Sequence, residues 1–197
     1  MIREEIRRRV AQKDLDTWNG MELFSPFLAK INAGLTVSEI VGHIYDSFRP
    51  LIPYNRISVA VLADSGAKVR SMAARSDSAN MVIKRGYEGP LAGSSLKNII
   101  ETGQPRVIND LEEYLRRHPD SKPTRDIVAE GMRSSLTCPL ISKGKSIGFL
   151  FFSSMTRSEY ADSHVELFRQ IASFVSIVVE KGLIHDELKE SLASGTA

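Results

Sequence analysis

Side chains that commonly carry chemistry are sparse in this 197-residue chain, which has one cysteine and four histidines. The histidines are His43, His118, His164 and His185, and no two of them stand at the spacing of a metal-binding motif. A single cysteine excludes a disulfide framework or a multi-cysteine zinc site within one chain. We therefore expect no metal site. A weaker alternative makes His118 a haem ligand, against the preferred interpretation of a solvated loop residue.

Cys138 stands between Thr137 and Pro139. A nucleophilic or redox-active cysteine needs a neighbour that lowers its thiol pKa, and the adjacent sequence offers none. Leu136 and Leu140 fall on the same face as Cys138 if the segment is a strand, because side chains alternate with a period of two. The pattern predicts a small buried side chain without catalytic activity.

A glycine-rich stretch over residues 86–93 precedes a short predicted helix. A nucleotide-binding P-loop requires Gly-Lys-Ser/Thr at that point, whereas Gly93 is followed by Ser94 and Ser95. Two interpretations stay open. Ser94 caps the helix as part of an ordinary turn, or the amides at the helix start hold an anionic ligand group.

Carboxylates in the same region are Asp110, Glu112, Asp126 and Glu130. We interpret them as solvated charges rather than an acid–base pair, because the sequence carries no spatial information that brings two of them together. No catalytic constellation emerges from these residues. We predict that the chain is not an enzyme.

The elements that must position these residues follow from hydrophobic periodicity, which changes between helical spacing and a period of two. Helices are predicted over 2–18, 21–33, 36–49, 94–101, 111–118, 124–131 and 162–192, and strands over 56–63, 67–74, 81–87, 106–108, 133–142 and 146–154. Thr36 and Glu39 have the spacing of a capping box. The irregular excursion over 86–131 has the character of a binding lid, since long loops in compact domains are usually functional.

Composition is that of one ordinary globular domain, with 42% hydrophobic and 25% charged residues. The net charge of +2 gives no electrostatic case for nucleic acid or an anionic membrane. No apolar run suits a signal peptide or a membrane span, so we expect a cytoplasmic protein.

Three segments together resemble the GAF domain family of sensory domains. EGMRSSLTCPLISKGKSIGFLFFSS (130–154) resembles its closing hairpin, SEYADSHVELFRQIASFV (158–175) its final helix, and ETGQPRVIND (101–110) its mid-domain segment. The resemblance covers roughly residues 21–182, between an N-terminal helix (1–20) and an extension of the last helix (183–197). It implies an α+β fold: an antiparallel sheet of about six strands with N- and C-terminal helices on one face and a ligand pocket on the other.

The resemblance leaves the ligand and any cofactor unidentified. Bilin-carrying members tend to place a histidine beside the attachment cysteine, sulfoxide-reducing members use several cysteines, and cyclic-nucleotide members carry an Asn-Lys-Phe-Asp-Glu signature. None of these features stands in this sequence. The residues expected to contact a ligand are Tyr87, Ser94, Ser95, Arg106, Thr137 and Cys138, although the sequence does not decide which strand face lines the pocket.

The long C-terminal helix carries two apolar stripes. One contains Leu167, Ile171, Phe174 and Val178 and resumes at Leu188 and Leu192; the other contains Phe168, Ala172, Val175 and Val179. One stripe packs on the sheet, and we expect the other to form a homodimer seam, the alternative being that the N-terminal helices cover it.

The leading hypothesis is a dimeric sensor of a small molecule that signals to a kinase, cyclase or transcription-regulator partner. Two alternatives remain. One is a free-standing enzyme with the same fold acting on a small metabolite, which a turnover assay separates from a sensor. The other is a structural dimerisation module without a ligand, which native mass spectrometry separates from it.

Overall fold

The computed structural model describes residue 29 and residues 35–194. Tertiary contacts divide the chain at Leu35, and the elements below belong to the second unit, Thr36–Ala197. In chain order they are α2 (Val37–Ser47), β1 (Arg56–Ala63), η1 (Asp64–Gly66), β2 (Lys68–Ser76), β3 (Glu88–Pro90), α3 (Leu96–Thr102), β4 (Arg106–Ile108), α4 (Leu111–Arg117), α5 (Lys122–Ala129), β5 (Ser134–Ser142), β6 (Lys145–Ser154) and α6 (Asp162–Ser194). The predicted helix over 2–18 and all but one residue of that over 21–33 lie outside the described residues.

The strands form one six-stranded sheet in the order β3-β2-β1-β6-β5-β4, antiparallel throughout. The α+β fold that the resemblance implied is therefore confirmed. Lys143 and Gly144 both have positive φ and close the β5–β6 hairpin in the turn geometry that suits its twist. At the sheet centre, a Cβ on Gly148 would lie 2.2 Å from the carbonyl oxygen of Ala60, so only glycine lets β1 and β6 approach here.

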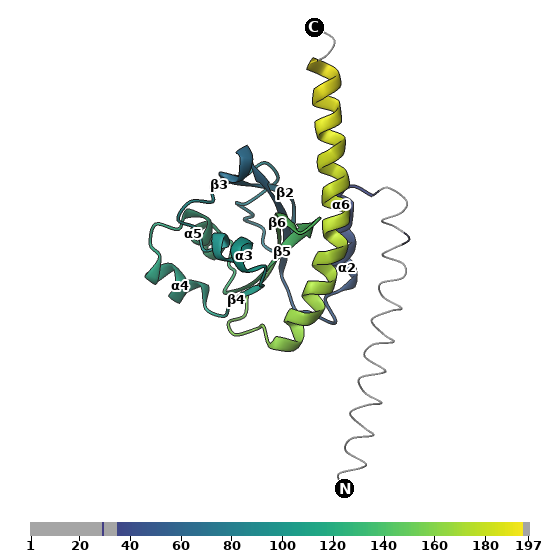
Figure 1. The fold of residues 1–197 in the computed structure, drawn as a ribbon. Helices are drawn as coiled ribbons and strands as arrows, with labels where there is room; N and C mark the ends of the chain where they lie inside the picture. Colours follow the sequence, from purple (N-terminus) through teal and green to yellow (C-terminus); the bar gives the residue numbers. More distant parts are fainter. Residues whose placement is uncertain (1–28, 30–34, 195–197) are drawn as a thin grey trace. The chain divides into compact units, whose positions relative to one another are not determined.

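Helices α2 and α6 lie beside each other on one face of the sheet (Figure 1). Thr36 begins α2 with the predicted capping box: its hydroxyl accepts from the Glu39 amide, and the Glu39 carboxylate accepts from the Thr36 amide. Ile40 and Ile44 of α2 are fully buried, as are Ile57 of β1 and Phe168 of α6. The main hydrophobic core therefore lies between the sheet and these two helices.

The segment between β2 and β5 covers the opposite face, where α3, α4 and α5 lie away from α2 and α6 (Figure 1). The strand predicted over 81–87 is wrong. The amides of Val82 and Ile83 donate to the Glu130 carboxylate, at 2.8 and 2.7 Å, instead of to a neighbouring strand. The strand in this region is shorter and later, at β3. A side chain 47 residues away along the chain thus decides the local conformation.

The seam predicted on α6 needs correction. Ile171 and Val178 are buried in the isolated chain together with the second stripe, because α2 packs against α6 as the sheet does. Gly182 of α6 faces Val37 of α2. Among the described side chains of α6, the large apolar residues left exposed are Ile177, Ile184 and Leu192, which are 43%, 51% and 68% exposed; Leu192 belongs to the predicted stripe.

Candidate ligand-binding site

A cavity of about 560 Å³ lies between the sheet and the α3–α5 excursion. Its floor shows the period of two of a strand: Arg56, Ser58 and Ala60 of β1 face the cavity, while Ile57 and Val59 between them are buried on the other face. Ser135 of β5 and Phe151 and Ser153 of β6 extend the floor. The volume is within the range of pockets that hold drug-sized ligands, roughly 300–1,000 Å³.

Four of the six residues predicted to contact a ligand line this cavity: Tyr87, Ser94, Ser95 and Arg106. Ser94 does not cap α3 from the predicted position, since Ser95 is its N-cap and Ser94 Oγ instead accepts from the Leu96 amide at 3.2 Å. The structure brings Ser95 and Arg106 together, because Arg106 donates a hydrogen bond to the Ser95 hydroxyl.

The other two predicted residues, Thr137 and Cys138, are not among those that line the cavity. Cys138 and Ser135 are an odd number of residues apart on β5, so their side chains point to opposite faces of the sheet. Cys138 therefore lies on the α6 face, where burial raises the pKa of its thiol to about 12. Thr137 has the cavity-side parity of Ser135, but it pairs with Arg106 of β4 and Phe151 of β6 and is fully buried. We leave both residues out of the proposed contact set.

Arg56 and Glu130 form a buried ion pair at one end of the floor, with the Arg56 Nε donating to Glu130 at 2.9 Å. The two terminal nitrogens of Arg56 donate to Ser58 Oγ at 2.6 Å and to the Ile83 carbonyl at 2.8 Å. Glu130 also accepts the two amides of residues 82 and 83. The pair therefore joins the floor, the segment before β3 and the end of α5, and every group in it has a partner.

A second connection joins the two sides of the excursion. The Tyr87 hydroxyl donates to the Asp126 carboxylate at 2.7 Å, and Lys122 donates to the same carboxylate at 2.8 Å. Burial raises the pKa of Asp126, but the hydrogen bonds from Lys122 and Tyr87 outweigh it and the pKa is lowered. The pKa of Tyr87 is raised, by burial first and then by its bond to Asp126. Asp126 thus stays ionised and Tyr87 protonated near neutral pH.

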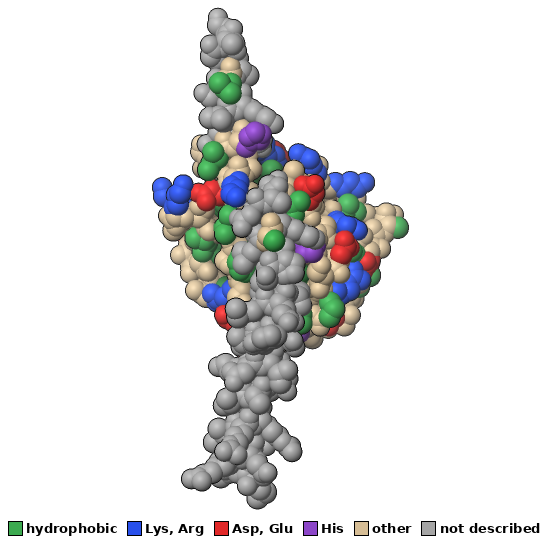
Figure 2. All heavy atoms as spheres, turned by 90° about the vertical axis from the view of Figure 1, so that its right-hand side faces the viewer, with side chains coloured by type: hydrophobic (Ala, Val, Ile, Leu, Met, Phe, Trp, Pro, Cys, Tyr) green, Lys and Arg blue, Asp and Glu red, His purple; other side chains and the backbone are tan. Residues whose placement is uncertain are grey.

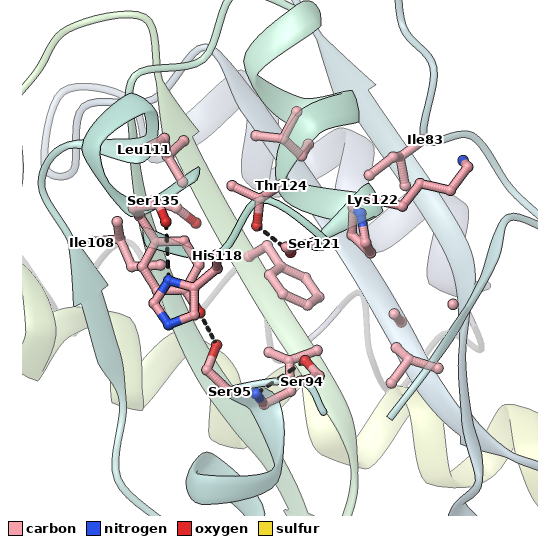
Figure 3. A pocket seen from close by; sticks show the side chains of 18 of the residues that line it. Ile83, Ser94, Ser95, Ile108, Leu111, His118, Ser121, Lys122, Thr124 and Ser135 are labelled. Atoms are coloured by element: carbon pink, nitrogen blue, oxygen red, sulfur yellow. Dashed lines mark hydrogen bonds between the residues drawn. The ribbon is translucent and has the colours of Figure 1, made fainter. Parts of the chain in front are cut away.

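A polar cluster on α3, β4 and α4 borders the cavity. Tyr114 donates to Ser95 Oγ at 2.7 Å, and the Tyr114 ring stacks on His118 at 4.1 Å between centroids. The Tyr114 carbonyl lies 2.9 Å from Nδ1 of His118, which fixes the hydrogen of a neutral imidazole on Nδ1. Figure 3 shows Ser95 and His118 on one side of the cavity and Ile83 and Lys122 on the other.

Sequence reasoning missed the floor, from Arg56 to Ser153, and also Tyr114. A signal for the floor was present. In RISVA (56–60) the polar Arg56 and Ser58 alternate with the apolar Ile57 and Val59, whereas a strand buried between two apolar layers reads as a continuous apolar run. Tyr114 gave no such signal, because an aromatic residue on a short helix is ordinary core composition.

Other kinds of site find little support in the described residues. They contain no group of three or more His, Cys, Asp or Glu side chains arranged to hold a metal ion. None of the helices in this part of the chain combines the length and apolar character that crossing a bilayer requires. Lys, Arg, Asp and Glu side chains are interspersed on the face that Figure 2 shows, outside the residues drawn in grey.

The fold is an α+β domain with a cavity between its antiparallel sheet and the α3–α5 excursion. The family model described as GAF domain matches residues 34–180, and the chain belongs to this family. None of the curated proteins matches the sequence significantly.

Solved GAF domains share the fold. One from a phosphoenolpyruvate-protein phosphotransferase of Coxiella burnetii has a TM-score of 0.67 at 14% identity, over 86% of this chain and 98% of that one. The phycocyanobilin-bound domain of a cyanobacterial phytochrome has a TM-score of 0.64 at 12% identity, over 84% and 96%. A third, from a two-component sensor histidine kinase of Bacillus halodurans, has a TM-score of 0.59 at 16% identity, over 75% and 96%. At these identities the likeness concerns the fold alone.

Proposed function

We propose that this chain is a regulatory domain that senses a small molecule and acts in signal transduction, without catalytic activity of its own. The observation that carries the proposal is the roofed cavity, which combines an apolar lining with a few polar groups in the manner of a ligand site. The phytochrome domain with its bound phycocyanobilin and the histidine-kinase domain are similar folds in signalling proteins.

A hydrogen-bonded connection supports the passage of a signal from the cavity to α6. Asn109 directly follows β4, which carries Arg106. The Asn109 side chain donates to the Tyr160 carbonyl at 3.2 Å and accepts from the Tyr160 amide at 3.3 Å. The backbone carbonyl of Asn109 accepts from the Ser158 amide at 2.8 Å. Tyr160 lies two residues before α6 begins at Asp162. A ligand that moved β4 would therefore move the start of α6.

The finer parts of the proposal concern assembly and location. We infer a homodimer held by the terminal helices and an output partner such as a kinase, a cyclase or a transcription regulator. We also place the domain in the cytoplasm, where a lone cysteine stays reduced. The exposed Ile177 and Ile184 support the dimer, because they stand one heptad apart on α6.

Native mass spectrometry of the full chain purified under non-denaturing conditions tests the ligand. We expect a bound small molecule in the unmodified protein and its loss in Ala60→Phe, which fills the cavity floor. Ala67→Phe is the matched control, since Ala67 is exposed and lies outside the cavity. A chain that carries no small molecule and gains no stability from any metabolite in a thermal-shift library would contradict the proposal. Turnover of a metabolite would favour the enzyme alternative.

A further inference from the structure

The charges that line the cavity do not balance. Four basic residues face it, Arg56, Arg106, Arg117 and Lys122, against a single acidic residue, Asp120. Three of the basic residues pair with carboxylates outside the lining. Arg56 pairs with Glu130, Arg117 with Glu113 and Lys122 with Asp126. Within the described residues, no carboxylate forms a hydrogen bond or ion pair with Arg106. Asp120 is exposed to solvent, so Arg106 is the lining charge that is held away from bulk water without a carboxylate partner among the described residues.

The surroundings of Arg106 are polar but neutral. One terminal nitrogen donates to Ser95 Oγ, and the guanidinium lies 5.8 Å from the centre of the Tyr114 ring. Its Nε is buried and has no hydrogen-bond partner among the described residues. Burial lowers the pKa of Arg106, which expresses the cost of holding this charge away from water. Arg106 as a whole is partly buried, and a charge held away from water in this way is normally compensated by an opposite one.

Ser95 extends the polar end of the cavity toward a ligand. Its Oγ accepts from both Arg106 and Tyr114, so its own hydroxyl hydrogen is left to donate to a third group. Two donors, one charged and one neutral, therefore meet at one point of the cavity wall. Much of the remaining wall is apolar: Ile83, Leu96, Ile108, Leu111, Ile127 and Phe151.

We propose that the cavity binds an organic anion, a largely apolar small molecule whose carboxylate or other oxyanion group is held by Arg106 and Ser95. The inference rests on the proposed ligand-sensing function and adds the chemical class of the ligand. Arg106 is a specificity-determining residue in this arrangement, since a neutral ligand would leave its charge uncompensated.

Two fluorescent dyes that differ in one anionic group test the inference. 8-Anilinonaphthalene-1-sulfonate carries a sulfonate, and N-phenyl-1-naphthylamine is the same molecule without it. Titration of the full chain with each dye gives the ratio of the affinity for the sulfonate dye to the affinity for the neutral dye. We expect Arg106→Met to lower this ratio, in favour of the neutral dye, by about tenfold or more, as for loss of a charge-assisted hydrogen bond. Arg106→Lys should restore part of it, because the positive charge is retained.

Matched controls separate the outcomes. Arg116→Met removes an exposed arginine of α4 that does not line the cavity, and it should leave the ratio unchanged. Ala60→Phe should weaken both dyes by blocking the floor. The inference is overturned if both dyes depend on Ala60 but Arg106→Met leaves their ratio unchanged, while cavity binding itself then stands. If Ala60→Phe affects neither dye, the cavity does not take up small molecules and the proposed function fails as well.

A second measurement tests whether Arg106 has a structural role instead. Removal of a partly buried charge without an ionic partner relieves a desolvation cost, so the melting temperature of dye-free Arg106→Met should equal or exceed that of the unmodified protein. A melting temperature several degrees lower, with loss of both dyes, would show that Arg106 supports the fold and would overturn its assignment to an anion.

Discussion

Arg56 and Arg106 both face the cavity, yet they play different parts at the residue scale. Arg56 is 1% exposed and has a partner for each of its three nitrogens, including the Glu130 carboxylate. Such a group is part of the fold, because loss of Glu130 would leave a buried charge unpaired. Among the described residues, the hydrogen bond of Arg106 is to Ser95 and its ring contact is to Tyr114, both uncharged. The number and charge of the partners, rather than the residue type, distinguish the structural arginine from the one available to a ligand.

Burial of Cys138 should make its thiol unreactive in the folded protein. A thiol with a pKa of about 12 is only about one ten-thousandth ionised at pH 8. We therefore expect Cys138 to react with a disulfide reagent such as dithionitrobenzoate only when the protein unfolds. Ligand binding should persist in Cys138→Ala, at a stability cost of about 1 kcal/mol from the lost packing.

Cys138→Ser should cost more stability than Cys138→Ala, since a hydroxyl enters the apolar layer beneath α6. Urea unfolding of the two variants measures the difference. Rapid labelling of the folded protein, or loss of ligand binding in Cys138→Ala, would show that this side chain reaches the cavity.

At the scale of elements, the excursion over residues 86–131 is anchored at both ends and loose between them. Tyr87 bonds to Asp126, and Glu130 holds residues 82 and 83. The helices between these anchors are seven or eight residues long, and the two strands among them, β3 and β4, have three residues each. Short helices of this kind owe their stability to packing rather than to their own hydrogen bonds.

Hydrogen exchange should reflect this construction. We expect amides between residues 111 and 129 to exchange much faster than those of the β5–β6 hairpin, because opening the short helices costs little free energy. Addition of 8-anilinonaphthalene-1-sulfonate should slow the fast amides and leave the hairpin unchanged. An excursion already as protected as the hairpin in the dye-free protein would refute the lid and favour the structural-module alternative.

The sequence sufficed for elements whose signals are local. The capping box of Thr36 and Glu39, the strand beginning at Arg56 and the turn at Gly144 are set by neighbouring residues, and all three were predicted. The segment over 81–87 failed because Glu130, distant in sequence, accepts its amides. Of the residues expected to contact a ligand, Ser95 and Arg106 line the cavity. Cys138 was selected without knowledge of the strand face, which only the packing of α6 on one side of the sheet determines. Thr137 has the cavity-side parity, but it is fully buried between its partners on β4 and β6.

At the scale of the whole molecule, α6 is the element that reaches beyond the domain. Its 33 residues extend about 50 Å at 1.5 Å per residue, and its last turns project past the sheet (Figure 1). Roughly its first half is buried against the sheet and α2, and these two partners cover the two apolar stripes of that half. A helix that leaves its own domain in this way offers a surface for a second copy, provided that apolar residues continue along it.

Ile177 and Ile184 continue the apolar surface along α6. They stand seven residues apart and are both about half exposed, so they lie on one line along α6. Replacing both with lysine would place two charges in a packed seam, where an unpaired charge is costly. We expect light scattering to show a dimer for the full chain and a monomer, or a dimer at least about tenfold weaker, for the double variant.

The control must show that association depends on the two α6 residues in particular, and not on exposed apolar residues in general. Val82, before β3, is 46% exposed and lies outside α6, so Val82→Lys should leave the association unchanged. A charge at Val178, in contrast, is unsuitable as a test, because Val178 is buried in the isolated chain and the substitution would damage the domain before it reached any seam. If the lysine variant of Ile177 and Ile184 formed a dimer as tight as the unmodified chain, the seam would have to lie elsewhere. The exposed line on α6 would then need no partner helix.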